Sequence, residues 1–118
     1  MKGLGYAALL ACAMMLLPRN VFALARWECR GLTADKIVLT PYQDGTVNLS
    51  FDDGPVRETT KWTHKGDVFT AIFQRVSGVN GAMLGYIIDA ITRNGYEFFQ
   101  KNDGQSGAAK MTCWYYQN

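Results

Sequence analysis

The sequence predicts a small all-β protein, an antiparallel up-and-down barrel of about eight strands that is closed by one disulfide. Three observations lead to this prediction. Turn residues recur every eight to twelve residues or so after Arg26, the segments between them are rich in β-branched and aromatic residues, and Cys29 and Cys113 lie near opposite ends of this region. A β-sandwich of two sheets with the same disulfide is the alternative architecture.

The start of the chain has the pattern of a cleavable export signal. Lys2 precedes an apolar run over residues 4–17, and Pro18 ends this run. The residues Ala23-Leu24-Ala25 then offer the small side chains of a cleavage site.

We therefore expect a signal peptide over residues 1–25, a single domain over residues 26–118, and a periplasmic or secreted location. A membrane anchor is one alternative, but the apolar run is shorter than the roughly 20 residues that cross a bilayer. We expect no stable membrane span once the signal is removed. A lipid attached at Cys12 is the second alternative, because the residues before this cysteine resemble a lipoprotein signal.

In the first half of the domain, short alternating segments lie between turns. Trp27 and Cys29 fall on one face of the first segment. Asp44-Gly45 suits the positive φ angles of a tight hairpin turn, and Pro55 cannot donate a hydrogen bond to a ladder, so a new strand begins after it. These signals predict strands over 26–31, 36–42, 46–52 and 56–63.

The second half of the domain follows the same scheme. A turn over His64-Lys65-Gly66 opens it, and Asn94-Gly95 is the strongest hairpin signal in the chain. Residues 82–91 also have helical spacing after Asn80, so a helix is the alternative there. The predicted strands cover 68–76, 82–91, 96–101 and 108–116, with loops over 77–81 and 102–107.

Cys29 and Cys113 fall in the first and last predicted strands. An even number of up-and-down strands makes these two antiparallel, so they can pair if the sheet closes. Neighbouring strands bring Cα atoms within the 7 Å or so that a disulfide needs. A bridge between them stabilises the domain by at most about 4 to 5 kcal/mol in the chain-entropy model. Two buried free thiols are the alternative.

The charge pattern argues against nucleic acid as a partner. The formal net charge is +2, and Lys2 and Arg19 in the predicted signal account for this excess. The remaining basic and acidic residues balance and are interspersed along the domain. A protein that binds a phosphate backbone needs a basic patch, which this sequence does not contain.

Residues that carry catalysis or bind metals form no recognisable motif. His64 is the only histidine and has no cysteine or acidic residue at metal-ligand spacing, so we expect a solvated loop residue. No serine lies in a nucleophile elbow, and the Asp-Gly pairs are typical of turns. We expect no enzyme, metal or cofactor, and the narrow interior of such a barrel disfavours a lipid or pigment carrier.

The last four predicted strands carry apolar side chains on both faces. Since only one face can point into the barrel, the surplus predicts an external aromatic and apolar patch, unless an irregular segment covers it. We therefore expect a non-enzymatic module that binds another envelope or extracellular protein, or a second copy of itself, through this patch. Its predicted residues are Phe69, Phe73, Phe99, Trp114 and Tyr116.

Two short stretches resemble a known inhibitor family. Residues 62–67, Trp-Thr-His-Lys-Gly-Asp, are similar to the Trp-Thr-Lys-Gly-Asp stretch of the periplasmic and membrane-bound inhibitors of C-type lysozyme, and Ser77-Gly78 is similar to their Ser-Gly motif. His64 is an insertion, and the two motifs occur in the opposite order. The resemblance implies an exported eight-stranded barrel that inhibits a secreted hydrolase, with Lys65 and Ser77 reaching the catalytic carboxylates.

Overall fold

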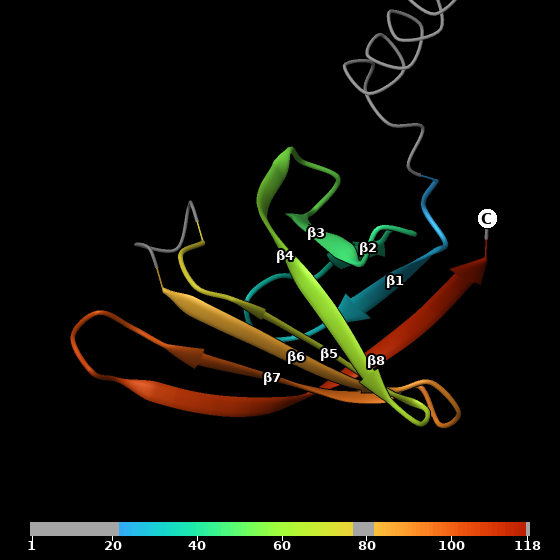
Figure 1. The fold of residues 1–118 in the computed structure, drawn as a ribbon. Helices are drawn as coiled ribbons and strands as arrows, with labels where there is room; N and C mark the ends of the chain where they lie inside the picture. The colour runs from blue at the N-terminus through green and yellow to red at the C-terminus, as the bar shows by residue number, and fades with distance from the viewer. Residues whose placement is uncertain (1–21, 77–81, 118) are drawn as a thin grey trace, which may run out of the picture.

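The computed structural model describes residues 22–76 and 82–117, which form eight antiparallel strands closed into a barrel (Figure 1). Each strand pairs with the next along the chain, and β1 pairs with β8 to complete the ring. The predicted barrel is thus confirmed, and the β-sandwich alternative is wrong. The strands are β1 (Ala25–Arg30), β2 (Ile37–Pro41), β3 (Thr46–Phe51), β4 (Val56–Lys65), β5 (Val68–Phe73), β6 (Met83–Asp89), β7 (Asn94–Gln100) and β8 (Ser106–Gln117).

Inward-facing side chains fill the barrel. The alternation predicted for the first strand is present in β1, where Trp27 and Cys29 are 4% and 1% exposed. Phe73 and Tyr86 are fully buried at the centre, with their ring centroids 6.0 Å apart. The interior is therefore a packed core, as expected for a barrel of eight strands. Its other members are Ile37, Leu39, Val47, Leu49, Phe51, Phe69, Ala71, Val76, Leu84, Ile88, Met111 and Cys113.

The disulfide lies where β1 and β8 close the ring. Cys29 and Cys113 are direct partners in the ladder, with Cα atoms 4.1 Å apart, and their sulfur atoms are bonded. The next inward pair, Trp27 and Tyr115, has ring centroids 4.7 Å apart. The predicted bridge is confirmed, and the free-thiol alternative is wrong.

The first described residues continue the sheet beyond β1. Ala23 bridges Tyr42, the Leu24 N–H donates to the Pro41 carbonyl at 2.9 Å, and Ala25 is buried. A chain that begins at Arg26 would lack these pairings. Most of the predicted export signal, including Cys12, lies outside the described residues. Within them, no helix is long and apolar enough to span a membrane.

The second half of the domain departs from the prediction at two turns. Residues 83–89 are extended in β6, so the helix alternative is wrong. The predicted Asn94-Gly95 turn is also wrong, because both residues lie within β7 and pair with neighbouring strands. The chain turns over residues 90–93 instead.

Asp89 explains the position of this turn. Its Oδ1 accepts hydrogen bonds from the N–H groups of Ile91 (2.9 Å) and Thr92 (3.1 Å), and Arg93 adopts a left-handed φ of 63°. An aspartate that caps the following N–H groups is a common turn device and replaces the two-residue hairpin. Gly95 allows β7 to pack closely against β6, since a Cβ there would lie 2.8 Å from the Ile87 carbonyl oxygen.

β4 is longer than predicted and ends in a two-residue turn. Lys65 pairs with Val68, and Gly66 has a φ of 60°. His64 is therefore a strand residue that pairs with Phe69, although it is exposed as expected. The prediction of a turn at His64 is wrong, because the glycine alone provides the positive φ that the hairpin requires.

A buried carboxylate fixes the loop between β1 and β2. Glu97 is 2% exposed, and its Oε1 accepts from the N–H groups of Leu32 and, at 3.1 Å, Thr33. The Thr33 hydroxyl donates to Glu97 Oε2 at 2.9 Å. Gly31 gives the carboxylate room, because a Cβ there would lie 2.7 Å from Oε1. These bonds satisfy a charge that would otherwise be costly to bury.

Candidate functional site

Two predicted binding residues, Trp114 and Tyr116, lie outside the barrel beside the β1–β8 junction. Tyr116 pairs with Arg26, and Trp114 pairs with Glu28. Since successive residues of a strand alternate between faces and Cys113 points inward, both aromatic side chains face solvent, and each is 45% exposed. We call the outward residues of this junction the seam surface, which consists of Arg26, Glu28, Arg30, Trp114 and Tyr116.

Charged groups orient the seam surface. The Arg26 guanidinium carbon lies 5.0 Å from the centre of the Tyr116 ring, and Arg26 Nε lies 3.7 Å from Glu28 Oε1. Lys36 Nζ lies 2.7 Å from Asp53 Oδ1 and 3.0 Å from Glu28 Oε1. These hydrogen bonds, first from Asp53 and then from Glu28, raise the pKa of Lys36. Exposed ion pairs of this kind add little stability.

A hollow of about 300 Å³ adjoins Trp114. Its walls combine the Trp114 ring with the charged side chains of Arg30 and Asp35. Glu28, Lys36 and the disulfide residue Cys29 complete its lining. The seam surface therefore offers an exposed aromatic ring, a concave region and fixed charges of both signs within one small area.

The other three predicted binding residues point into the barrel. Phe73 is fully buried, Phe69 is 7% exposed, and Phe99 packs against the core. Their assignment to an external patch is wrong, because the register of β5 to β7 turns these side chains inward. The alternation within each strand was evident in the sequence, but the sequence did not show which of the two faces points into the barrel.

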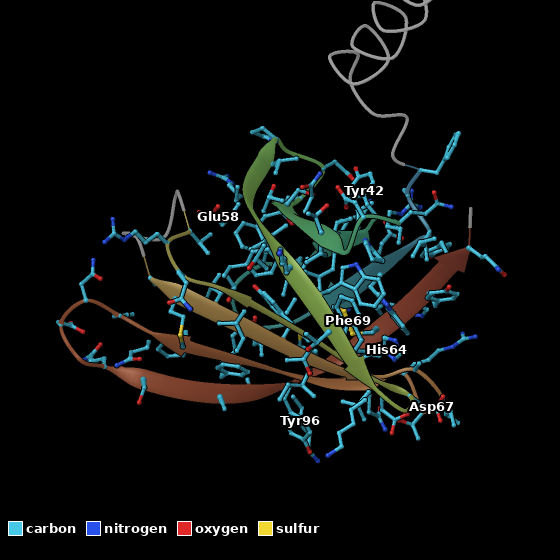
Figure 2. All side chains as sticks on the ribbon, viewed as in Figure 1. Tyr42, Glu58, His64, Asp67, Phe69 and Tyr96 are labelled. Atoms are coloured by element: carbon cyan, nitrogen blue, oxygen red, sulfur yellow. A yellow bond between two sulfur atoms is a disulfide. The ribbon has the colours of Figure 1, made fainter. Side chains whose placement is uncertain are left out.

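The surplus apolar side chains do form an outer face, built from other residues. Ile72, Ile87 and Tyr96 are 39%, 37% and 48% exposed on β5, β6 and β7, and Figure 2 shows Tyr96 pointing away from the barrel. The Phe98 ring lies over Gly85, where a Cβ would come within 1.9 Å of it. A glycine opposite an aromatic residue was the sequence signal that could have identified the outward face of β7.

The two residues suggested by the inhibitor resemblance have different outcomes. Lys65 is exposed at the end of β4, beside the hairpin turn, and pairs with Val68 across the ladder. No ion pair involves Lys65 among the described residues. Ser77 lies outside the described residues, so the structure does not place it next to Lys65.

Metal ligands do not gather in the part of the chain that the structure describes. No group of three histidine, cysteine, aspartate or glutamate side chains there is close enough to hold an ion. The His64 ring lies beside Trp62 in a tilted arrangement, with ring centroids 5.8 Å apart. Its neighbour is thus an aromatic ring and not a set of carboxylates.

Comparison with known proteins adds no family. No protein-family model matches the chain, and no curated protein or solved structure is significantly similar to it. The inhibitor resemblance therefore stays a prediction, and the functional argument depends on the surfaces described above.

Proposed function

We propose that this protein is an exported, non-enzymatic binding module that docks another envelope or extracellular protein on its seam surface. The observation that carries the proposal is the pair of aromatic side chains on β8, Trp114 and Tyr116, which stay nearly half exposed beside the arginine residues of β1. Tryptophan, tyrosine and arginine are the residue types that dominate binding energy at protein interfaces.

The surface also indicates what the partner presents. An apolar side chain of the partner would fill the hollow beside Trp114, and a carboxylate would approach Arg26 or Arg30. Because the disulfide joins β1 and β8 directly beneath, these residues are held before binding, which lowers the cost of ordering them.

Capture from envelope extract tests the proposal. The wild-type protein, Trp114→Ala and Tyr96→Ala are each crosslinked to the extract, and the bound proteins are measured by mass spectrometry. Tyr96 is the matched control, because it is an exposed aromatic residue on the outside of a different strand. We expect one partner to be captured by the wild type and by Tyr96→Ala but lost by Trp114→Ala.

The affinity for that partner gives the sharper measurement. A central tryptophan contributes about 2 kcal/mol or more, so Trp114→Ala should raise the Kd about 30-fold. An unchanged Kd in a correctly folded Trp114→Ala variant would refute the seam surface as the docking site. Sedimentation of the purified protein shows whether the captured partner is a second copy of the chain.

A second candidate function is inhibition of a secreted hydrolase such as C-type lysozyme. It is favoured by Lys65, a cation presented at the end of a hairpin, since such hydrolases cut glycosidic bonds with a pair of carboxylates in a cleft. Lysozyme activity is measured with the wild type, Lys65→Ala and the control Lys61→Ala. Inhibition that disappears only in Lys65→Ala would support this function, and a wild type without inhibition would exclude it.

A further inference from the structure

The open end of the barrel beside the β4–β5 hairpin holds a separate hollow of about 210 Å³. Trp62, His64 and Phe69 line it from β4 and β5, and Trp27 and Tyr115 line it from β1 and β8. In a ring of eight strands, these two pairs of strands face each other. Figure 2 shows His64, Asp67 and Phe69 at this end of the barrel. We call this hollow the aromatic mouth.

The rings of the aromatic mouth are held in place by contacts among themselves. Trp62 stacks on Phe69 with ring centroids 5.7 Å apart, and its Nε1 donates to the Tyr42 carbonyl oxygen at 3.3 Å. On the opposite wall, Tyr115 packs on Trp27 at 4.7 Å. The mouth is therefore formed before any ligand arrives, which reduces the cost of binding.

The aromatic mouth contains an acidic residue but no lysine or arginine. Asp67 provides a carboxylate in the lining, whereas neither lysine nor arginine belongs to it. The faces of tryptophan, tyrosine and phenylalanine rings carry partial negative charge and attract cations. Pro41 and Ala90 add apolar walls.

From these features, we propose that the aromatic mouth binds a small organic cation, a substituted ammonium group that enters between the rings and lies near Asp67. The volume is below that of most pockets for drug-sized ligands, so the mouth accepts a single compact group. A free alkylammonium compound and the side chain of a lysine in a peptide present the same chemistry.

This site is independent of the proposed protein docking. Tyr115 points into the mouth, whereas its neighbours Trp114 and Tyr116 point outward on the seam surface. Failure of one proposal therefore leaves the other intact, and the variants that test them differ.

Titration of the purified exported protein with choline tests the proposal, with tryptophan fluorescence or calorimetry as the readout. The matched neutral ligand is 3,3-dimethylbutan-1-ol, which has the shape of choline without its charge. Nα-acetyl-lysine amide is the third probe, and all titrations are done at pH 8. We expect saturable binding of choline or of the lysine derivative, and an affinity for the neutral alcohol about ten-fold lower than for choline.

Two variants locate the binding. Asp67→Asn should weaken cation binding about three- to ten-fold, and Tyr115→Leu should weaken it further. Their matched controls, Asp103→Asn in the β7–β8 loop at the other end of the barrel and Tyr96→Leu on its outside, should leave it unchanged. Binding of the lysine derivative alone would assign the site to a peptide, and binding of choline would assign it to a free cation. Saturable binding of the neutral alcohol with the same affinity as choline, or no saturable binding of either cation, would overturn the proposal.

Discussion

Removal of the Glu97 carboxylate is expected to destabilise the protein more than any exposed substitution. Glu97→Ala takes away the acceptor for the Leu32 N–H and for both the N–H and the hydroxyl of Thr33. It also leaves a space beside Gly31. Glu97→Gln keeps the shape of the side chain and one of the two acceptor oxygens.

The magnitude follows from the number of bonds. Each hydrogen bond to a charged group contributes about 1.5 to 3 kcal/mol, but the freed groups lie in a part-buried loop where water can replace some of the lost bonds. We therefore expect Glu97→Ala to lower the free energy of unfolding by about 3 to 4 kcal/mol and Glu97→Gln by about 1 kcal/mol. A domain of this size has a total stability of about 5 to 14 kcal/mol.

Urea unfolding of the oxidised protein, followed by tryptophan fluorescence, measures these differences. Asp103→Ala is the control, because Asp103 accepts one bond from the Gln105 N–H in an exposed loop, and it should change stability by less than about 1 kcal/mol. Hydrogen exchange at the Leu32 and Thr33 amides should accelerate in Glu97→Ala. A Glu97→Ala variant as stable as Glu97→Gln would refute the role assigned to the carboxylate.

Three further outcomes are expected. Replacement of Cys29 and Cys113 by serine should lower the free energy of unfolding by up to about 4 to 5 kcal/mol, as measured by urea unfolding. An unchanged urea midpoint would contradict the role of the disulfide in closing the barrel. Gly85→Ala should destabilise the fold by about 1 to 3 kcal/mol by displacing the Phe98 ring, and a double-mutant cycle with Phe98→Ala should show that the two changes are coupled. Burial, and then the neighbouring Glu97 carboxylate, raise the pKa of Tyr86. The protonated Tyr86 side chain therefore contributes fully to the free energy of unfolding below pH 10.0, and this contribution is lost as the pH rises above it. The urea midpoint of unfolding should therefore decrease as the pH is raised beyond 10.0, and it should decrease less in Tyr86→Phe. Identical pH profiles of the two proteins would contradict this prediction.

The strands that alternate clearly were the most predictable. In β1 the large inward residue Trp27 is followed by outward Glu28, so strand, face and disulfide all follow from the sequence. In β5 both faces are apolar, and the inward Phe69 and outward Ile72 cannot be told apart until the ladder with the next strand is known. Which face of such a strand points into the barrel depends on the neighbouring strands and not on its own sequence pattern.

Three local features were not predicted from the sequence. The turn before β7 is set by Asp89, whose side chain caps two later N–H groups, and this outweighs the Asn94-Gly95 hairpin signal. Glu97 carried a usable signal, because an acidic residue on the same face of the strand as Phe99 is unusual. The aromatic mouth could not be predicted, since its rings come from strands on opposite sides of the barrel.

The bridge between the two terminal strands gives the molecule a particular resistance to proteases. Because Cys29 and Cys113 are 84 positions apart, nearly the whole folded chain forms a covalent circle. A single nick in any hairpin between them opens that circle but leaves one connected molecule, in which every strand still has both neighbours. The nicked barrel would therefore stay assembled until a second cut released a fragment.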